Sequence, residues 1–285
     1  FDDLVSFLLS KNKPIHVVAH SMGGVLFREF MLTGKQWVTL NNSVGFKALF
    51  LGAPLGGSYL IPETLTGRGG NINKLSKLDL RHDKKELLAV FAKCPGLYSL
   101  LPLRSDVHDF GTPAIWKTMF DNTMNIGEEP SDGILKTFNA FRKRALDNED
   151  KLDFKNIIYV AGKDDSTTAT FVIEDTGRGN DLVFKTTTEG DGSVTWESGI
   201  PKALIKRDAV YYCNTTHGEL ANDETLFAPF LELFRTGQTT VLRKVPPVTR
   251  GASGLADKPK YEIEPVNDRN LEAVVLDIKP KEKGK

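Results

Sequence analysis

The sequence predicts an α/β protein whose sheet is mostly parallel and is flanked by helices. Two observations predict this class. Four short apolar runs are typical of parallel strands buried on both faces, and each run leads into a turn rich in glycine, asparagine or serine. The four runs are 15–19, 46–51, 157–161 and 209–213. Because ligands and catalytic groups gather at the carboxyl ends of such strands, the residues that follow each run are the first candidates for function.

Length and composition set limits on the fold and on the partners. The chain has 285 residues, of which 40% are hydrophobic, so it can build a sizeable core. Its 37 basic and 37 acidic residues give a formal net charge of zero, and no basic patch with interleaved aromatic residues is present. The sequence therefore gives no sign of nucleic acid as a partner. No apolar run approaches the roughly 18 residues of a membrane span.

The first run ends in a serine motif, Ala19-His20-Ser21-Met22-Gly23, a variant of G-x-S-x-G with alanine in the first glycine position. A serine that attacks a carbonyl carbon must stand exposed on a tight turn between a strand and a helix, where bulky neighbours do not fit. Ala19 and Gly23 are therefore expected at the two crowded positions. The next residues have helical character, which puts the backbone N–H of Met22 at a helix N-terminus as an oxyanion donor. The motif predicts Ser21 as a nucleophile.

The segment before this strand has the pattern of the end of an amphipathic helix, with Leu4, Phe7 and Leu8 on one face. An α/β protein with a nucleophile strand normally has several strands before it. We therefore expect the sequence to be a piece of a longer protein, and we expect the N-terminal strands to be missing from this piece. The loop that normally supplies a second oxyanion N–H is not in this sequence, and any targeting segment would lie upstream.

A serine nucleophile needs a histidine base. The chain has five histidines, His16, His20, His82, His108 and His217. His217 follows the fourth run in CNTTHGEL and precedes a helical pattern, which fits the chain order serine, acid, histidine. His217 is the predicted base, whereas the side chain of His20 is expected to point away from the substrate face.

The base in turn needs a carboxylate that fixes its tautomer, and two places in the sequence can supply it. Asp191 lies in GDGSV, where glycines on both sides let the loop bend the carboxylate towards an imidazole. Asp164 and Asp165 lie in GKDD, directly after the third run. We favour Asp191 because its motif is the sharper one, and Asp165 remains the alternative acid.

The long region between the second and third runs has no strand pattern. Its helical periodicity is fair over 84–93 and good over 134–146, so we expect a helical cap insertion at about 58–153 that covers the site. An elaboration at the edge of the fold is the alternative. The aromatic and leucine side chains of this region can wall an apolar pocket or form the core of the cap. They are Phe91, Leu97, Tyr98, Leu100, Leu101, Trp116 and Phe120.

The remaining segments complete the predicted organisation. Alternating patterns over 170–175 and 181–187 predict a β-hairpin, and 220–236 predicts a closing helix. We expect a catalytic domain over 1–237, then a linker and C-terminal extension over 238–285. Within this extension, 261–277 can be an arm packed on the domain or the start of another module.

Four segments together resemble the lecithin–cholesterol acyltransferase-like branch of the α/β hydrolases, which includes lipases and relatives of the GPI inositol deacylases. They are AHSMGG, LGAPLGGS, GDGSV and NTTHGEL, and CPGLYSLLP is similar to the cap of that group. The resemblance covers roughly 1–237. It implies an α/β-hydrolase fold with Ser21 as nucleophile, Asp191 as acid and His217 as base. It also implies that residues 52–58 shape the floor of the site and the root of the cap.

These residues favour a serine ester hydrolase that acts through an acyl-enzyme on a lipid or another acyl ester. An acyltransferase with the same triad is one alternative, since the same acyl-enzyme can pass to an alcohol. A non-catalytic regulatory module of a multidomain protein is another. The intact order of serine, acid and histidine argues against this last reading.

The sequence predicts no cofactor and no metal site, since it has neither H-E-x-x-H nor paired cysteines nor a glycine-rich phosphate loop. Cys94 and Cys213 are expected to be packing residues, and two distant cysteines lean towards a reducing compartment such as the cytoplasm. The expected partner is an acyl ester or lipid substrate. Peripheral contact with a membrane and further domains of the same polypeptide are left open.

Overall fold

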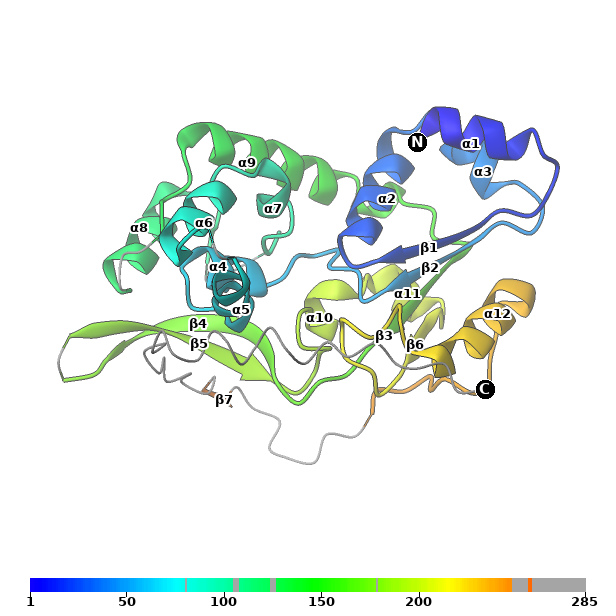
Figure 1. Ribbon diagram of the computed structural model, residues 1–285. Helices are drawn as coiled ribbons and strands as arrows, with labels where there is room; N and C mark the ends of the chain where they lie inside the picture. The colour runs from blue at the N-terminus through cyan, green and yellow to red at the C-terminus, as the bar shows by residue number, and fades with distance from the viewer. Residues whose placement is uncertain (80, 105–107, 124–126, 178, 248–255, 258–285) are drawn as a thin grey trace.

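The computed structural model describes residues 1–79, 81–104, 108–123, 127–177, 179–247 and 256–257. The segment 261–277, predicted as an arm or a further module, lies outside these residues. Helices separate the strands of a central sheet along the described chain, and helices lie on both faces of this sheet (Figure 1).

The four apolar runs form the strands of this sheet. They are β1 (His16–His20), β2 (Lys47–Leu51), β3 (Ile157–Ala161) and β6 (Val210–Tyr212). The strand order is β1-β2-β3-β6, and every neighbouring pair is parallel. The predicted fold class is therefore confirmed. Because parallel strands end at the same edge, the turns that follow the strands are brought together there.

Helices α1 (Asp2–Leu9), α2 (Met22–Thr33), α3 (Trp37–Asn41), α10 (Trp196–Gly199) and α11 (Lys202–Lys206) lie on one face of the sheet, and α12 (Phe227–Thr236) lies on the other (Figure 1). Alternate residues of the strands face the two layers. Ala48 and Phe50 of β2 belong to the core beneath α2, whereas Leu49 and Leu51 pack with Phe230 of α12. Burial on both faces explains why β2 and β3 are continuously apolar rather than alternating. The prediction of two buried faces is wrong for β1, an edge strand in which Val18 is 55% exposed.

Two predicted helices differ from the structure. In α1 the buried residue is Val5, and Leu8 of the predicted face is partly buried against the core. Leu4 and Phe7 of that face are 56% and 57% exposed, so the face that packs is turned from the predicted one. The closing helix does not begin at residue 220. A 3₁₀ turn, η2 (Glu224–Leu226), precedes α12, because the side chain of Asp223 accepts a hydrogen bond from the backbone N–H of Thr225 and begins the turn there.

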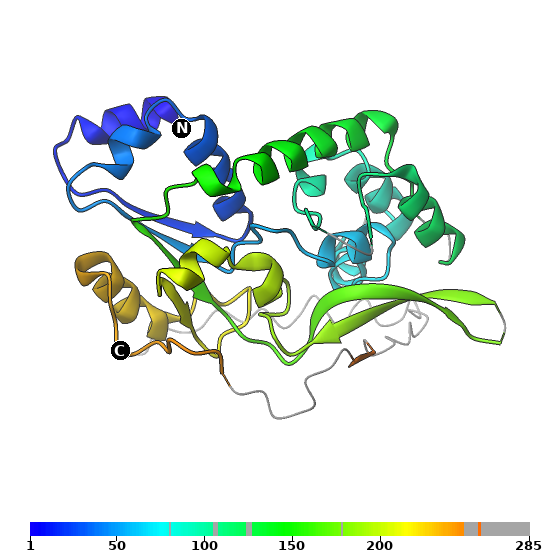
Figure 2. The same cartoon turned by 180° about the vertical axis from the view of Figure 1, so that it is seen from behind.

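The chain between β2 and β3 is helical, as predicted. It forms a group of helices beside the sheet and above a β-hairpin (Figures 1 and 2). Sequence signals start several of these helices: Asp83 and Glu86 make a capping box, and Ser131 caps the backbone N–H of Ile134. The helices are α4 (Leu60–Leu65), α5 (Gly70–Leu78), α6 (Lys84–Phe91), α7 (Pro95–Tyr98), α8 (Pro113–Asp121), α9 (Asp132–Asp147) and η1 (Glu149–Lys151).

The large side chains of the cap mostly form its own core. Tyr98, Leu101, Trp116 and Phe120 are buried, and the indole N–H of Trp116 donates to the carbonyl of Phe110 at 2.9 Å. Phe91, Leu97 and Leu100 are partly buried against this cluster. These side chains are expected either to wall an apolar pocket or to form the core of the cap, and the four buried ones belong to the core.

The hairpin below the cap is formed by β4 (Thr167–Asp175) and β5 (Asn180–Thr187), which pair antiparallel, with the two residues of β7 (Ala256–Asp257) alongside β5. The strand β4 starts three residues before the predicted position. Thr167 and Thr168 extend it because they are buried, and Thr168 donates to the buried carboxylate of Glu63 in α4 at 2.6 Å. This bond ties the hairpin to the cap.

None of the helices in the described part of the chain is long and apolar enough to cross a membrane. Both cysteines are free. Cys213 is buried, and burial raises the pKa of its thiol to about 11. Cys94 is exposed at the N-terminus of α7, so its prediction as a packing residue is wrong.

Candidate active site

Ser21 occupies the sharp turn between β1 and α2. Its backbone has φ 54° and ψ −125°, a conformation that costs a residue other than glycine about 1–3 kcal/mol. Two hydrogen bonds hold the turn: the N–H of Ser21 donates to the carbonyl of Leu51 at 2.9 Å, and the N–H of Gly24 donates to the carbonyl of Ser21 at 3.0 Å. The turn presents the hydroxyl at the carboxyl edge of the sheet, as the motif predicts.

The crowded glycine of this turn is Gly24. A Cβ atom on Gly24 would lie 2.3 Å from the Cβ of Ala53, whereas a Cβ on Gly23 would meet no atom within 4 Å. The expectation that Gly23 fills a crowded position is therefore wrong. Gly24 is needed because α2 crosses the loop after β2 at close range, a contact that the local motif does not reveal.

The structure brings Ser21, His217 and Asp191 together. The Oγ of Ser21 lies 2.8 Å from Nε2 of His217, and Nδ1 of the same ring lies 2.9 Å from Oδ2 of Asp191. This arrangement fits the tautomer in which Nδ1–H donates to the carboxylate and Nε2 accepts from the serine. The three residues come from segments up to 196 positions apart. Ser21 and His217 follow the parallel strands β1 and β6, whereas Asp191 lies in the loop after β5, which the N–H of Asp164 joins to the turn after β3 through the carbonyl of Gly190 at 2.7 Å.

The carboxylate of Asp191 is buried, and both of its oxygens accept hydrogen bonds. The residue is 2% exposed, and its Oδ1 accepts hydrogen bonds from the backbone N–H groups of Ser193 and Val194 at 3.0 and 2.8 Å. Its carbonyl also accepts from the backbone N–H of His217 at 2.7 Å. A buried carboxylate is tolerated when its oxygens are satisfied in this way.

The alternative acids lie elsewhere. The side chain of Asp165 is 95% exposed, and its carboxylate pairs with the ammonium of Lys163 at 3.3 Å. Asp164 accepts from the backbone N–H groups of Asp165 and Ser166, which closes the turn after β3. The structure brings neither carboxylate to His217.

The backbone of Gly52 lies against the contact between Asp191 and His217. It has φ +55°, and a Cβ there would lie 2.6 Å from Oδ2 of Asp191 and 3.0 Å from Nδ1 of His217. Only glycine fits both the conformation and the space. The sequence pattern places Gly52 in the floor of the site but gives no sign of this contact.

We expect Gly52→Ala to reduce the rate of a reaction catalysed at this site about 100-fold, because the new methyl group must displace the carboxylate of Asp191 or the imidazole of His217. The matched control is Gly177→Ala. Gly177 has a similar φ of +72°, and a Cβ there meets nothing within 4 Å, so it carries the backbone strain without the clash. Steady-state kinetics and thermal unfolding of both variants check this. Equal turnover in the two would contradict the proposed contact.

The rest of the loop after β2 links the site to its surroundings. The guanidinium of buried Arg28 donates to the carbonyl of Leu55, and the N–H of Gly56 donates to the carbonyl of Ser198 at 2.7 Å. The N–H of Ser58 donates to the carbonyl of Leu100 in the cap at 2.8 Å. These bonds fit the implied role of 52–58 as the floor of the site and the root of the cap.

Tyr159 of β3 lies under the same loop. Its hydroxyl donates to the carbonyl of Ala53 at 2.8 Å. Burial first, and then the nearby Asp191 carboxylate, raise the pKa of Tyr159 well above its usual value, so the phenol stays neutral and keeps this hydrogen bond. Tyr159 therefore acts as a fixed donor that holds the floor of the site.

The other histidines are distributed over the molecule. His16 stacks on Phe234, and His82 pairs with Asp79, whose hydrogen bond raises the pKa of the imidazole. His108 is buried in the cap, where burial lowers its pKa. His20, which is expected to point away from the substrate face, lies with its ring 5.0 Å from the ring of His217, centroid to centroid.

Met22 is the first residue of α2, and its side chain is exposed. No acceptor for its backbone N–H is found in the part of the chain that the structure describes. An N–H at the first position of a helix has no partner inside the helix. It is therefore available to an oxyanion formed next to Ser21.

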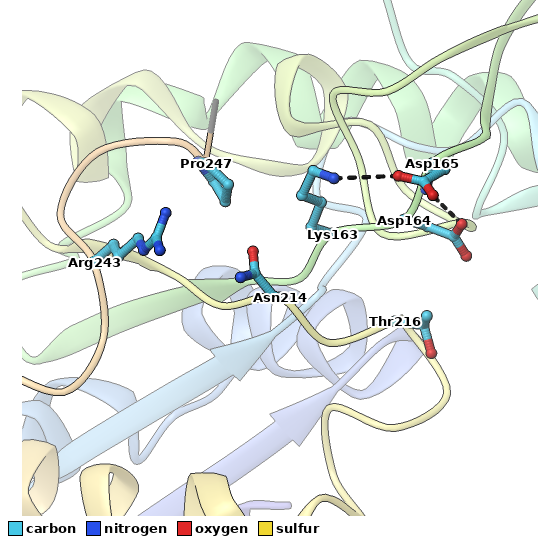
Figure 3. A pocket seen from close by; sticks show the side chains of 7 residues that line it. All are labelled: Lys163, Asp164, Asp165, Asn214, Thr216, Arg243 and Pro247. Atoms are coloured by element: carbon cyan, nitrogen blue, oxygen red, sulfur yellow. Dashed lines mark hydrogen bonds and ion pairs between the residues drawn. The ribbon is translucent and has the colours of Figure 1, made fainter. Parts of the chain in front are cut away.

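A polar pocket of about 390 Å³ lies beside the loops that carry Asp191 and His217, at the carboxyl ends of β3 and β6. Figure 3 shows Arg243 on one side, the carboxylates of Asp164 and Asp165 on the other, and Lys163 between them. Ser21 does not line it. Because acyl chains need apolar walls, this pocket is not built to hold one. Within the described ranges, no group of three or more His, Cys, Asp or Glu side chains is placed to hold a metal ion.

The comparisons with known proteins agree with this fold. A sequence profile of the lecithin:cholesterol acyltransferase family matches residues 4–163, more than half of the 285 residues. The matched part contains Ser21 and residues 52–58, and it ends before Asp191 and His217. No curated protein matches the sequence.

Two solved structures are similar to the chain. A chain in the crystal structure of the Tle4–Tli4 complex has a TM-score of 0.53 and 12% sequence identity, and the match covers 83% of the present chain and 64% of that one. The mature lipase BlEst2 of Bacillus licheniformis has a TM-score of 0.33 and 13% identity, with 81% and 70% covered. The first likeness shows the fold alone, which is the α/β-hydrolase fold.

Proposed function

The chain belongs to the lecithin:cholesterol acyltransferase family, and from this we propose that it is a serine ester hydrolase acting on a lipid or another acyl ester. One observation carries the proposal. Ser21, His217 and Asp191 form a continuous line of hydrogen bonds, with 2.8 and 2.9 Å between the paired atoms, at the carboxyl edge of the sheet. A serine linked in this way to an imidazole and a buried carboxylate is an activated nucleophile.

In the proposed reaction, Oγ of Ser21 bonds to the carbonyl carbon of the ester while its proton passes to Nε2 of His217. The Asp191 carboxylate stabilises the imidazolium, and the N–H of Met22 faces the oxyanion. The carbon–oxygen bond to the alcohol then breaks, and the alcohol oxygen takes the proton from Nε2. Water attacks the acyl-enzyme with the same base, which releases the acid and restores the serine.

The family match favours a second function, acyl transfer. The acyl-enzyme is the same, and an alcohol takes the place of water in the second half of the reaction. The choice depends on which acceptor reaches the acyl-enzyme. A product analysis with and without added alcohol separates the two functions.

The experiment uses the full-length polypeptide. It is treated with a fluorophosphonate probe, the adduct is located by mass spectrometry, and turnover is measured on acylglycerol, phospholipid and simple ester substrates. We expect an adduct on Ser21 and hydrolysis of at least one class of ester. A folded protein that neither takes up the probe nor cleaves any ester would overturn the proposal and favour a regulatory module.

We also propose that residues 1–237 form the catalytic domain, with its cap at about 58–153, and that 238–285 form a C-terminal extension. Limited proteolysis tests this boundary, beyond which Leu242 is buried and the backbone of Arg243 pairs with Tyr212 of β6, and a stable product that ends near residue 237 would support it. The two free cysteines favour a reducing compartment, such as the cytoplasm, for this activity. Cys94 is the exposed thiol, so its alkylation by a membrane-impermeant reagent should require lysis of the cells if this location is right.

A further inference from the structure

The side chain of His20 contacts the main chain of the proposed base. Its Nε2 lies 2.8 Å from the carbonyl oxygen of His217, so Nε2–H donates to that carbonyl. The two rings are tilted by 40° with their centroids 5.0 Å apart. His20 is the last residue of β1, directly before Ser21, and so shares the rigid strand that positions the nucleophile.

Both polar groups of the His217 backbone are therefore fixed by the other parts of the site. Its N–H donates to the carbonyl of Asp191 at 2.7 Å, and its carbonyl accepts from His20 at 2.8 Å. The side chain repeats these links, with Nδ1 bonded to Asp191 and Nε2 to Ser21. The base is thus held at four atoms, two of them bonded to the consecutive residues His20 and Ser21.

The loop around His217 needs such an anchor. Its neighbours Thr216 and Gly218 are exposed, and a Cβ at Gly218 would meet no atom within 4 Å, so open space surrounds this side of the loop. The N–H groups of Glu219 and Leu220 both donate to the carbonyl of Thr216 at 3.1 Å, which closes a turn around residues 217 and 218, and His20 adds a bond to the carbonyl of His217 itself. A shift of about 1 Å in a reacting group can cost about 100-fold in rate.

We propose that His20 is a positioning residue, which fixes the backbone of His217 so that Nε2 stays within hydrogen-bond distance of Ser21. This inference rests on the proposed function, because it concerns the same serine and base. His20 takes no part in the bond changes. It acts through His217, and what it supplies is one N–H donor at a fixed position on β1.

Three substitutions of His20 distinguish the role of its N–H donor from the role of its ring. His20→Gln keeps an N–H donor that can reach the same carbonyl, His20→Phe keeps a ring without a donor, and His20→Ala removes both. We expect His20→Phe and His20→Ala to lower kcat about 10- to 100-fold with little change in KM. His20→Gln should retain most of the wild-type kcat. A ring needed only for packing would give the reverse order, with phenylalanine better than glutamine.

The matched control is His16→Ala, since His16 lies at the other end of the same strand and its ring stacks on Phe234. It should leave kcat unchanged. Thermal unfolding of all four variants shows whether kcat follows stability. The proposal is overturned if His20→Ala and His20→Phe have the kcat of His16→Ala, or if phenylalanine rescues and glutamine does not.

A second readout keeps this test separate from that of the proposed function. The rate of fluorophosphonate labelling of Ser21 measures activation of the serine without any ester substrate. If labelling follows the same order among the variants but no ester is cleaved, the positioning role stands and the hydrolase proposal fails. If the wild type is not labelled, the imidazole N–H signal of His217 in NMR decides, since the proposal requires it to change in His20→Phe and stay in His20→Gln.

Discussion

Replacing Ser21 with alanine is expected to reduce ester turnover on the order of 10⁶-fold, to the level of the uncatalysed reaction plus what binding alone contributes. The substitution removes the hydroxyl oxygen that lies 2.8 Å from Nε2 of His217. The backbone conformation of residue 21 stays as strained for alanine as for serine, so the fold should be unaffected. Substrate binding, which depends on the rest of the site, should change far less than kcat.

The measurement is turnover and fluorophosphonate labelling of the full-length polypeptide, with Ser99→Ala as the matched control. The hydroxyl of Ser99 donates to the carbonyl of Gly96 in the cap and makes no contact with the site. The control should keep full activity and the adduct on Ser21. If Ser21→Ala retained saturable turnover that the probe still blocks, another residue would be the nucleophile.

The sheet and the turn at Ser21 could be predicted because both depend on local pattern. A run that is buried on two faces reads as continuously apolar, and the strand, serine and helix of the turn are adjacent in sequence. His217 and Asp191 were found by chain order and by flanking glycines, which are again local. The shared edge of the parallel strands brings the segments of Ser21 and His217 together, and the loop after the hairpin strand β5 adds Asp191.

The contacts that support the site could not be predicted, because they join residues far apart in the sequence. Gly52 is special only because Asp191 and His217 lie above it, and Gly24 only because Ala53 lies against it. The contact of His20 with the main chain of His217 could not be predicted for the same reason. Strand alternation suggests which way a side chain points, but it does not tell which loop will fold over that side.

The two helices that differ from the prediction show a similar limit. The apolar pattern of 220–236 begins in the turn after His217. Leu220 is buried, but it belongs to that turn and not to a helix, and its N–H donates to the carbonyl of Thr216. A buried leucine fits either conformation, so hydrophobicity alone does not decide it. In α1 the residues that pack are Val5, Leu8 and Leu9, whereas Leu4 and Phe7 of the predicted face are exposed, a difference that the helical period alone does not reveal.

Asp191→Asn is expected to lower kcat about 10⁴-fold, although asparagine has nearly the shape of aspartate. The reason lies in the donors around the side chain. Oδ1 already accepts from the N–H groups of Ser193 and Val194, so these fix the amide oxygen of an asparagine in the same place. The amide nitrogen must then face Nδ1 of His217 and donate to it.

An imidazole that accepts at Nδ1 carries its proton on Nε2, where it points at Ser21 and leaves no lone pair for the serine proton. The variant should therefore fold, bind substrate and fail at the chemical step. Asp165→Asn is the matched control and should have wild-type kcat, since Asp165 is exposed and pairs with Lys163. Steady-state kinetics of both variants, with the imidazole tautomer read by nitrogen NMR, check the argument. A larger loss in Asp165→Asn than in Asp191→Asn would assign the acid to the turn after β3, because only the true partner of the base controls which nitrogen carries its proton.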